Sequence, residues 1–312
     1  MAYVGLHTQI QRNNLKSVAL LLSFPLLILV GVFVVLSYLT GWDWNAAVDP
    51  FLSTIPYVIG IVAVWFGISY FFHNQMIQGA TKAVPLDRRN NMRVYNLTEN
   101  LCMSVGMKMP ALYIIESPAL NAYASGINEK SFAVTLTRGL VDSLTDEELE
   151  GVIAHELMHI RNKDVRLLIV TIVFVGIFGV VVDILFRNIL FGNMTRRRND
   201  KDQGSPVIIV IFIVAIVLYF LSMIFKFALS RSREYMADAG AVEMTRNSMA
   251  MASALRKVSG RSKVTTSNDE VKELFLDNTP EEGSSKGFLG GIGNLFSTHP
   301  PIEKRIKILE NM

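Results

Sequence analysis

The chain has 312 residues, of which 51% are hydrophobic, and its formal net charge is +3. Its basic residues stand beside apolar blocks rather than among aromatic residues, so nucleic acid is not an expected partner. The single cysteine, Cys102, excludes an internal disulfide, and nothing indicates an oxidising compartment.

The hydrophobic residues are concentrated in four blocks. Three blocks carry no charge and one carries only Asp183: they are Ser17 to Leu39, Phe51 to Phe72, Leu167 to Phe186 and Ser205 to Phe225. Each can cross a bilayer core of about 30 Å, so we expect four transmembrane helices. The first is expected to be a retained anchor, because it is too long for a signal peptide and no convincing cleavage site follows it.

Lysine and arginine placement predicts the orientation in the membrane. The connection between the first two blocks has no basic residue, whereas the flanking segments carry Arg12, Lys16, Lys82, Arg88, Arg89 and Arg93. By the positive-inside rule, both long polar segments lie on the cytoplasmic side of the plasma membrane. The connection between the last two blocks is also basic, although a full hairpin would place it outside the cell. We expect both blocks to cross the membrane fully; the alternative is a hairpin that enters the bilayer without crossing it.

The polar segment between the two pairs of blocks predicts strands followed by a helix. Ala111 to Ser117 and Ser131 to Thr137 are rich in branched and aromatic residues and suggest a short sheet, with a turn-like stretch between them. Thr145 and Glu148 match a capping box, which predicts a helix that begins there. We expect this helix to run on into the third apolar block.

The stretch GVIAHELMHI, residues 151 to 160, lies in that helix. Residues four apart share a helix face, so His155 and His159 can bind one metal ion. Neutral imidazole suits Zn²⁺, and Glu156, turned about 100° away, can take a proton from water that the ion activates. A chance match and histidines hydrogen-bonded in a core are the alternatives.

A third ligand is needed, but the pattern with a third histidine is absent, because Asn162 stands where its glycine would be and Val165 where the histidine would be. In SREYMADAGAVEM, Glu234 and Asp238 are four apart, so one can ligate while the other orients a histidine. A solvated acidic face is the alternative. If both helices continue out of the membrane, His159 and Glu234 lie about 12 and 13 Å above the same surface.

His299 lies in STHPPIEKR, where the prolines prevent helix and predict a turn before an amphipathic C-terminal stretch. The residues leave two interpretations open. His299 either acts at the metal, at the developing oxyanion or the open ligand position, or is a histidine of a surface loop.

Together these motifs resemble a known family. PALNAYASG, LTDEELEGVIAHELMHIRNKD, SREYMADAGAVEMT and FSTHPPIEKRI, in this order around four apolar blocks, resemble the HtpX family of membrane zinc endopeptidases. These are heat-shock proteases related to the prenyl-protein (CAAX) proteases. The resemblance covers nearly the whole chain.

The resemblance implies a mainly α integral membrane protein, with four transmembrane helices and a zincin-like (gluzincin) α+β catalytic domain. It implies one Zn²⁺ per subunit held by His155, His159 and Glu234, with Glu156 as base and Asp238 as support. It further implies His299 near the reacting carbonyl and a substrate-binding edge strand that contains Asn121, Ala122, Tyr123 and Ala124. Arg305 fits the family pattern without an assigned role, and residues 264–293, which match least, are expected to form a mobile loop that could cover the site.

We therefore expect residues 1–73 to hold the tail and the first two membrane helices, residues 74–166 and 227–312 to form the two halves of the catalytic domain, and residues 167–226 to form a second membrane hairpin. The expected function is stress-related quality control, in which the enzyme hydrolyses peptide bonds of misfolded or damaged membrane proteins or of unfolded peptides at the bilayer. The alternatives are a narrow-specificity processing protease for a lipidated or signalling peptide, a membrane metal carrier, and an inactive membrane chaperone. The oligomeric state is not predictable from the sequence.

Overall fold

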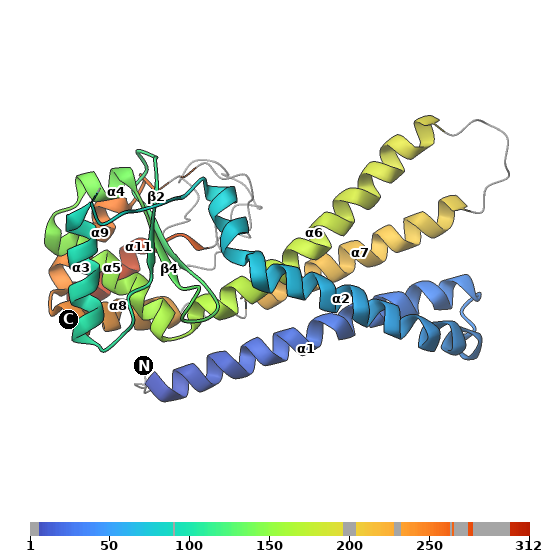
Figure 1. Ribbon diagram of the computed structural model, residues 1–312. Coiled ribbons are helices and arrows are strands. Elements are labelled where there is room, and N and C mark those ends of the chain that lie inside the picture. The colour runs from blue at the N-terminus through green and yellow to red at the C-terminus, as the bar shows by residue number, and fades with distance from the viewer. Residues whose placement is uncertain are drawn as a thin grey trace. The chain divides into compact units, whose positions relative to one another are not determined.

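The computed structural model describes residues 6–89, 91–195, 204–227, 232–262, 264, 274–276 and 300–312. The described elements are, in chain order, α1 (Leu6–Leu39), α2 (Trp44–Thr81), β1 (Val84–Pro85), α3 (Met92–Ser104), β2 (Ala111–Ile115), β3 (Ala122–Ser125), β4 (Ala133–Thr137), α4 (Arg138–Ser143), α5 (Asp146–Arg161), α6 (Asp164–Thr195), α7 (Gly204–Phe227), α8 (Ser232–Thr245), α9 (Ser248–Val258) and α11 (Ile302–Leu309) (Figure 1). They form two compact units: residues 1–14, 72–169 and 227–312 make the first, and residues 15–71 and 170–226 make the second.

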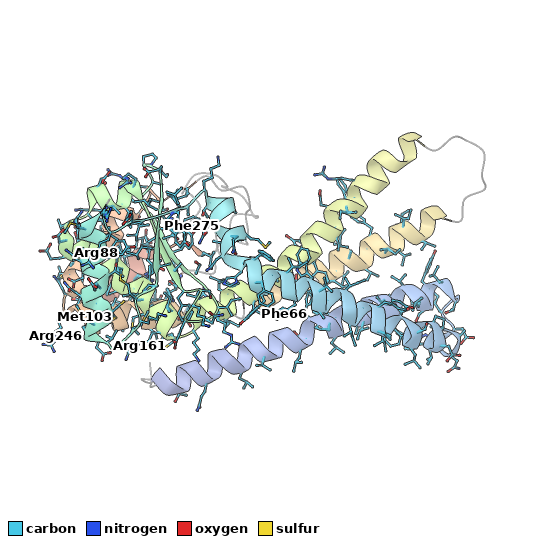
Figure 2. The ribbon with its side chains drawn as sticks, viewed as in Figure 1. Phe66, Arg88, Met103, Arg161, Arg246 and Phe275 are labelled. Carbon is cyan, nitrogen blue, oxygen red and sulfur yellow. The ribbon has the colours of Figure 1, made fainter. Side chains whose placement is uncertain are left out.

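The second unit is built from long apolar stretches of α1, α2, α6 and α7. Its small core consists of Phe24, Val170 and Phe178, with the rings of the two phenylalanines 5.1 Å apart, and Phe66 packs against it (Figure 2). Large apolar side chains nevertheless stay exposed on these helices, for example Tyr57 at 73% and Ile61 at 71%. Apolar surface of this kind on long helices suits lipid rather than water.

Two of the described helices are long and apolar enough to cross a membrane, α1 through Leu22–Leu39 and α2 through Trp44–Thr81. In α7 the apolar run is shorter, from Val207 to Ser222. The described residues therefore contain two candidate spans by length and composition. The arrangement with four spans stays a prediction.

The first unit contains a four-stranded sheet in the order β1, β2, β4, β3. β2 and β4 pair in parallel with Ala111 opposite Ala133, which confirms the short sheet predicted from these two stretches. The stretch between them, which reads as a turn, also contributes β3, paired antiparallel to β4 with Ala122 opposite Leu136. All four residues of β3 are buried, so its sequence lacks the alternation that marks a half-buried strand.

Helix α5 begins at the predicted position. The side chain of Thr145 accepts from the backbone N–H of Glu148 while Glu148 accepts from the Thr145 N–H, so the capping box is confirmed. The Glu148 carboxylate is buried and also accepts from Ser253 and Lys257, at 2.6 Å each. These bonds tie the start of α5 to α9.

The end of α5 differs from the prediction. The helix does not run on into the third apolar block, because it ends at Arg161 and α6 begins at Asp164. Between them Lys163 has a φ of 59°, a left-handed conformation that a continuous right-handed helix cannot include. The heights estimated above for His159 and Glu234 assumed unbroken helices and therefore do not hold for α5.

Helix α5 packs against α8, α9 and strands β3 and β4 within the first unit (Figure 1). Gly240 of α8 faces Met158 of α5 so closely that an added Cβ would stand 2.4 Å from the Met158 Cε. A larger residue there would have to displace the Met158 side chain. This close approach sets α8 beside the face of α5 that carries the histidines.

Substituting Thr145→Ala tests the importance of the cap for α5. Loss of the hydroxyl leaves a helix N–H without its partner, so the free energy of unfolding of the first unit falls by about 1 kcal/mol. The measurement is thermal or denaturant unfolding of the detergent-solubilised protein. Thr145→Ser keeps the oxygen and is the matched control; equal unfolding of both variants and the parent would contradict the assigned cap.

Candidate metal centre

His155 and His159 of α5 and Glu234 of α8 come together inside the first unit. The two histidine Nε2 atoms are 3.1 Å apart, and each lies 3.7 Å from Glu234 Oε2. One ligand atom from each residue lies within 4.8 Å of the others. His155 and Glu234 are buried and His159 is partly exposed, so these three residues could hold one metal ion.

A carboxylate holds the other nitrogen of each ring. Asp238 Oδ1 is 2.9 Å from His155 Nδ1, and Asp164 Oδ2 is 3.1 Å from His159 Nδ1. A carboxylate that accepts from Nδ1–H leaves Nε2 as the metal-facing atom and fixes the ring. Asp238 was predicted in this position, whereas Asp164 was missed, although it follows the second histidine by five residues.

Glu156 is buried, and it lines the same pocket as Ala124, His159 and Glu234. Burial raises the pKa of the Glu156 carboxyl above its usual value, against the opposing influence of the two histidines. A carboxyl with a raised pKa is a better proton acceptor at its working pH. The pocket therefore contains a base beside the candidate ligands.

Two buried arginines complete the charged cluster, and sequence reasoning assigned a role to neither. Arg233 Nε donates to Glu234 Oε1 at 3.2 Å. Arg305 contacts Asp238, and although burial opposes ionisation, the guanidinium holds the pKa of Asp238 down at about 2. The proximity of Arg233 to Glu234 in the sequence is the one signal that could have indicated its role.

The buried charges fit a divalent cation. Glu156, Asp164, Glu234 and Asp238 are each at most 3% exposed, against the two guanidiniums of Arg233 and Arg305. Counted with all four carboxylates charged, these groups have a formal excess of two negative charges over the two arginines, of which a protonated His159 would offset one, and a buried excess is costly unless it is compensated. A dication held by His155, His159 and Glu234 would compensate it.

The backbone of β3 alternates between its neighbour β4 and the open edge. The Asn121 carbonyl accepts from the Thr137 N–H. In this antiparallel pair the backbone N–H and C=O groups of Asn121 and Tyr123 therefore point toward β4, and those of Ala122 and Ala124 point toward the outer edge. The Tyr123 side chain is buried, and its hydroxyl lies 2.9 Å from Thr81 Oγ1. Of the four residues predicted to bind substrate, Ala124 is the one that lines the pocket.

Part of the outer edge of β3 is covered by the segment Leu274–Leu276. The Leu276 N–H donates to the Ala122 carbonyl at 2.8 Å, and Leu274 lines the pocket with Ala124. Phe275 lies beside the sheet with its ring 5.2 Å from that of Tyr123 (Figure 2). Apart from Val264 and this segment, the predicted loop 264–293 lies outside the described residues, as does His299.

Comparisons with known proteins agree on one family. Residues 88–312 match the sequence profile of peptidase family M48. The chain is 50% identical to a protein named Protease HtpX homolog from Bacteroides fragilis, with 99% of each chain covered, and 36% identical to a Listeria monocytogenes protein of the same name, with 98% of this chain and 100% of that one covered. A solved structure, Ste24p from S. mikatae, is similar at a TM-score of 0.46 and 20% identity, over 90% of this chain and 62% of that one.

The proton on His159 predicts how metal binding depends on pH. Although burial opposes protonation, Glu234 and Asp164 raise the pKa of His159 to about 10 in the metal-free protein. A ligating histidine must be neutral, so binding at pH 7.5 releases a proton, and affinity weakens by about tenfold for each pH unit below 10. Calorimetry of Zn²⁺ binding in two buffers of different ionisation enthalpy measures the release.

Asp164→Asn removes one of the two carboxylates that raise this pKa, so the pH above which binding no longer releases a proton should be lower in the variant than in the parent. Binding that releases no proton in the parent protein would contradict a protonated His159.

Proposed function

Because the chain belongs to peptidase family M48 and is a metallopeptidase, we propose that it is a zinc-dependent endopeptidase that hydrolyses misfolded or damaged membrane proteins. The observation that carries the proposal is the placement of Glu156 in one pocket with His159, Glu234 and the edge residue Ala124. A base, ligands for a metal and a backbone edge for a peptide are the parts that this reaction needs.

The ligands favour zinc. Two imidazoles and one carboxylate form the ligand set of many catalytic zinc sites of the gluzincin type, in which a fourth position stays open. When bound, the ion would polarise the carbonyl under attack and make water acidic enough to lose a proton near neutral pH. His155, His159 and Glu234 would hold it through Nε2, Nε2 and Oε2.

Glu156 carries out the proton transfers. Its carboxylate takes the proton of the attacking water and later gives it to the nitrogen of the leaving amine, so one group serves as base and then as acid. Because water attacks directly, no covalent acyl-enzyme forms. His299 is proposed to donate to the oxyanion that develops on the substrate carbonyl.

The substrate would lie along the outer edge of β3. A peptide that adds to this edge would exchange main-chain hydrogen bonds with Ala124. The enzyme would then recognise the backbone of the substrate rather than its side chains. Val165 and Leu168 form part of the apolar lining of the same pocket. At Ala122 the peptide would have to displace Leu276 from the carbonyl that it now contacts.

This mode of binding favours broad quality control over narrow processing. Extended backbone is available in any unfolded segment, so a strand edge that binds main chain would accept many different sequences. The apolar helices α1 and α2 would keep the enzyme at the bilayer where such substrates occur. Cleavage of several unrelated membrane proteins would separate this function from that of a processing protease.

Glu156→Gln tests the assigned base. The amide cannot accept the proton, so cleavage of an unfolded test protein by the full-length variant should fall by about 10²- to 10⁴-fold. Zinc content should stay near one per chain, because Glu156 is not a proposed ligand. Glu147→Gln changes an exposed glutamate of the same helix and should leave cleavage unchanged. Equal cleavage by Glu156→Gln and the parent would refute the mechanism.

We further propose that the protein crosses the membrane four times and that the first unit faces the cytoplasm. The positive charges that flank α1 and α2, and the absence of basic residues between these helices, support this orientation. A full crossing by α6 and α7 would return the chain to the same side after each hairpin. Both parts of the first unit would then face the cytoplasm.

Cysteine labelling tests the orientation. Trp42, between α1 and α2, is 57% exposed and Met103 of α3 is 67% exposed, whereas the native Cys102 thiol is buried and its pKa is raised to about 11. In a Cys102→Ala background, a membrane-impermeant maleimide should label Trp42→Cys in intact cells. It should label Met103→Cys only after permeabilisation. The reverse pattern would overturn the orientation.

A further inference from the structure

Helix α11 carries an arginine at the centre of its buried face. The buried residues of this helix are Ile302, Arg305 and Leu309, a spacing of three and four that points one face into the core. Arg305 is 1% exposed. A guanidinium at a position that would ordinarily hold an aliphatic residue is costly unless it makes specific contacts.

The contacts of Arg305 converge on one carboxylate. Its Nε donates to Asp238 Oδ2 at 2.9 Å and its Nη2 donates to Asp238 Oδ1 at 2.7 Å. Two donors on two oxygens hold the carboxylate in one plane and one orientation. The remaining nitrogen, Nη1, donates to the Leu276 carbonyl at 3.3 Å and lies 3.8 Å from Glu234 Oε2.

The same carboxylate holds the first histidine of the site. Asp238 Oδ1, which accepts from Arg305, also lies 2.9 Å from His155 Nδ1, and Arg305 Nη2 is 3.4 Å from His155 Nε2. Three helices therefore meet in one chain of contacts, from α11 through α8 to α5. Rotation of the Asp238 carboxylate would release the His155 ring, whose Nε2 faces His159.

We propose that Arg305 is a positioning residue of the metal centre: by gripping both oxygens of Asp238, it fixes the carboxylate that holds His155 with Nε2 toward the metal. The inference rests on the proposed zinc site and adds a residue to it. Helix α11 would then contribute to metal affinity by orienting Asp238, and not only by neutralising its charge.

The geometry distinguishes this role from that of a simple counter-charge. A lysine would keep the positive charge, but its single ammonium cannot match the two-point grip of the fork. If only charge matters, Arg305→Lys binds zinc as tightly as the parent. If orientation matters, Arg305→Lys binds more weakly, and Arg305→Met binds more weakly still.

The first experiment measures zinc affinity of the full-length protein by competition with a chelator. Loss of a partner that orients a ligand typically weakens metal binding by about 10- to 100-fold, and this loss is expected for Arg305→Met. Lys307→Met on the exposed face of α11 is the control and should bind as the parent does. Parent-like affinity of Arg305→Lys or Arg305→Met overturns the proposal.

A double-variant cycle asks whether Arg305 acts through Asp238. Asp238→Asn should weaken zinc binding, and adding Arg305→Met to it should weaken binding no further, because the carboxylate to be oriented is already gone. Independent, multiplying losses would overturn the proposal. If either single variant fails to fold, Arg305→Lys is compared directly with the parent: weaker binding supports the proposal and equal binding overturns it.

The outcome separates the two proposals. A parent protein that binds no zinc refutes the proposed function. The cycle is then read from unfolding free energies, in which full additivity of the two substitutions overturns the proposed coupling. A parent that binds zinc, with affinity unchanged by Arg305 substitution, refutes the positioning role alone.

Discussion

The approach of α8 to α5 is the constraint on which the metal centre depends. The two histidines lie on one helix and the carboxylate on another, so their three ligand atoms meet only while these helices stay close. Gly240 of α8 lies against the Met158 side chain of α5, α9 packs against both helices, and α11 packs against α8 and α9. The capped start of α5 and its ion pair to α9 hold the helix in register with its neighbours. The arrangement of the three ligand residues therefore follows from ordinary core packing.

Charge is the second constraint on the site. Carboxylates are placed where burial alone would make them costly, and three of them have a partner: Arg305 contacts Asp238, Arg233 contacts Glu234, and His159 contacts Asp164. In the metal-free protein a proton on His159 offsets part of the negative excess. A dication would replace that proton, which links metal binding, folding and pH in one electrostatic balance.

Local patterns predicted most of the ligand chemistry because it resides in short sequence spacings. The capping box placed the start of α5 correctly, and the i, i+4 histidines share a face, as helical geometry requires. The break at Lys163 was not predictable, because a positive φ at a lysine leaves no mark in composition. Strand β3 was not predicted either, because its four residues are all buried and show no alternation, and the asparagine, serine and glycine near them are typical of a turn.

The sequence by itself determined the family, the metallopeptidase chemistry and the residues able to bind a metal, because each depends on residue types at short spacings. Tertiary structure alone decided that Arg305, 67 positions after Asp238, grips that carboxylate. It also decided that Leu276 covers the edge of β3 at Ala122. Contacts between residues so far apart depend on how the helices and strands pack, and no local pattern encodes that packing.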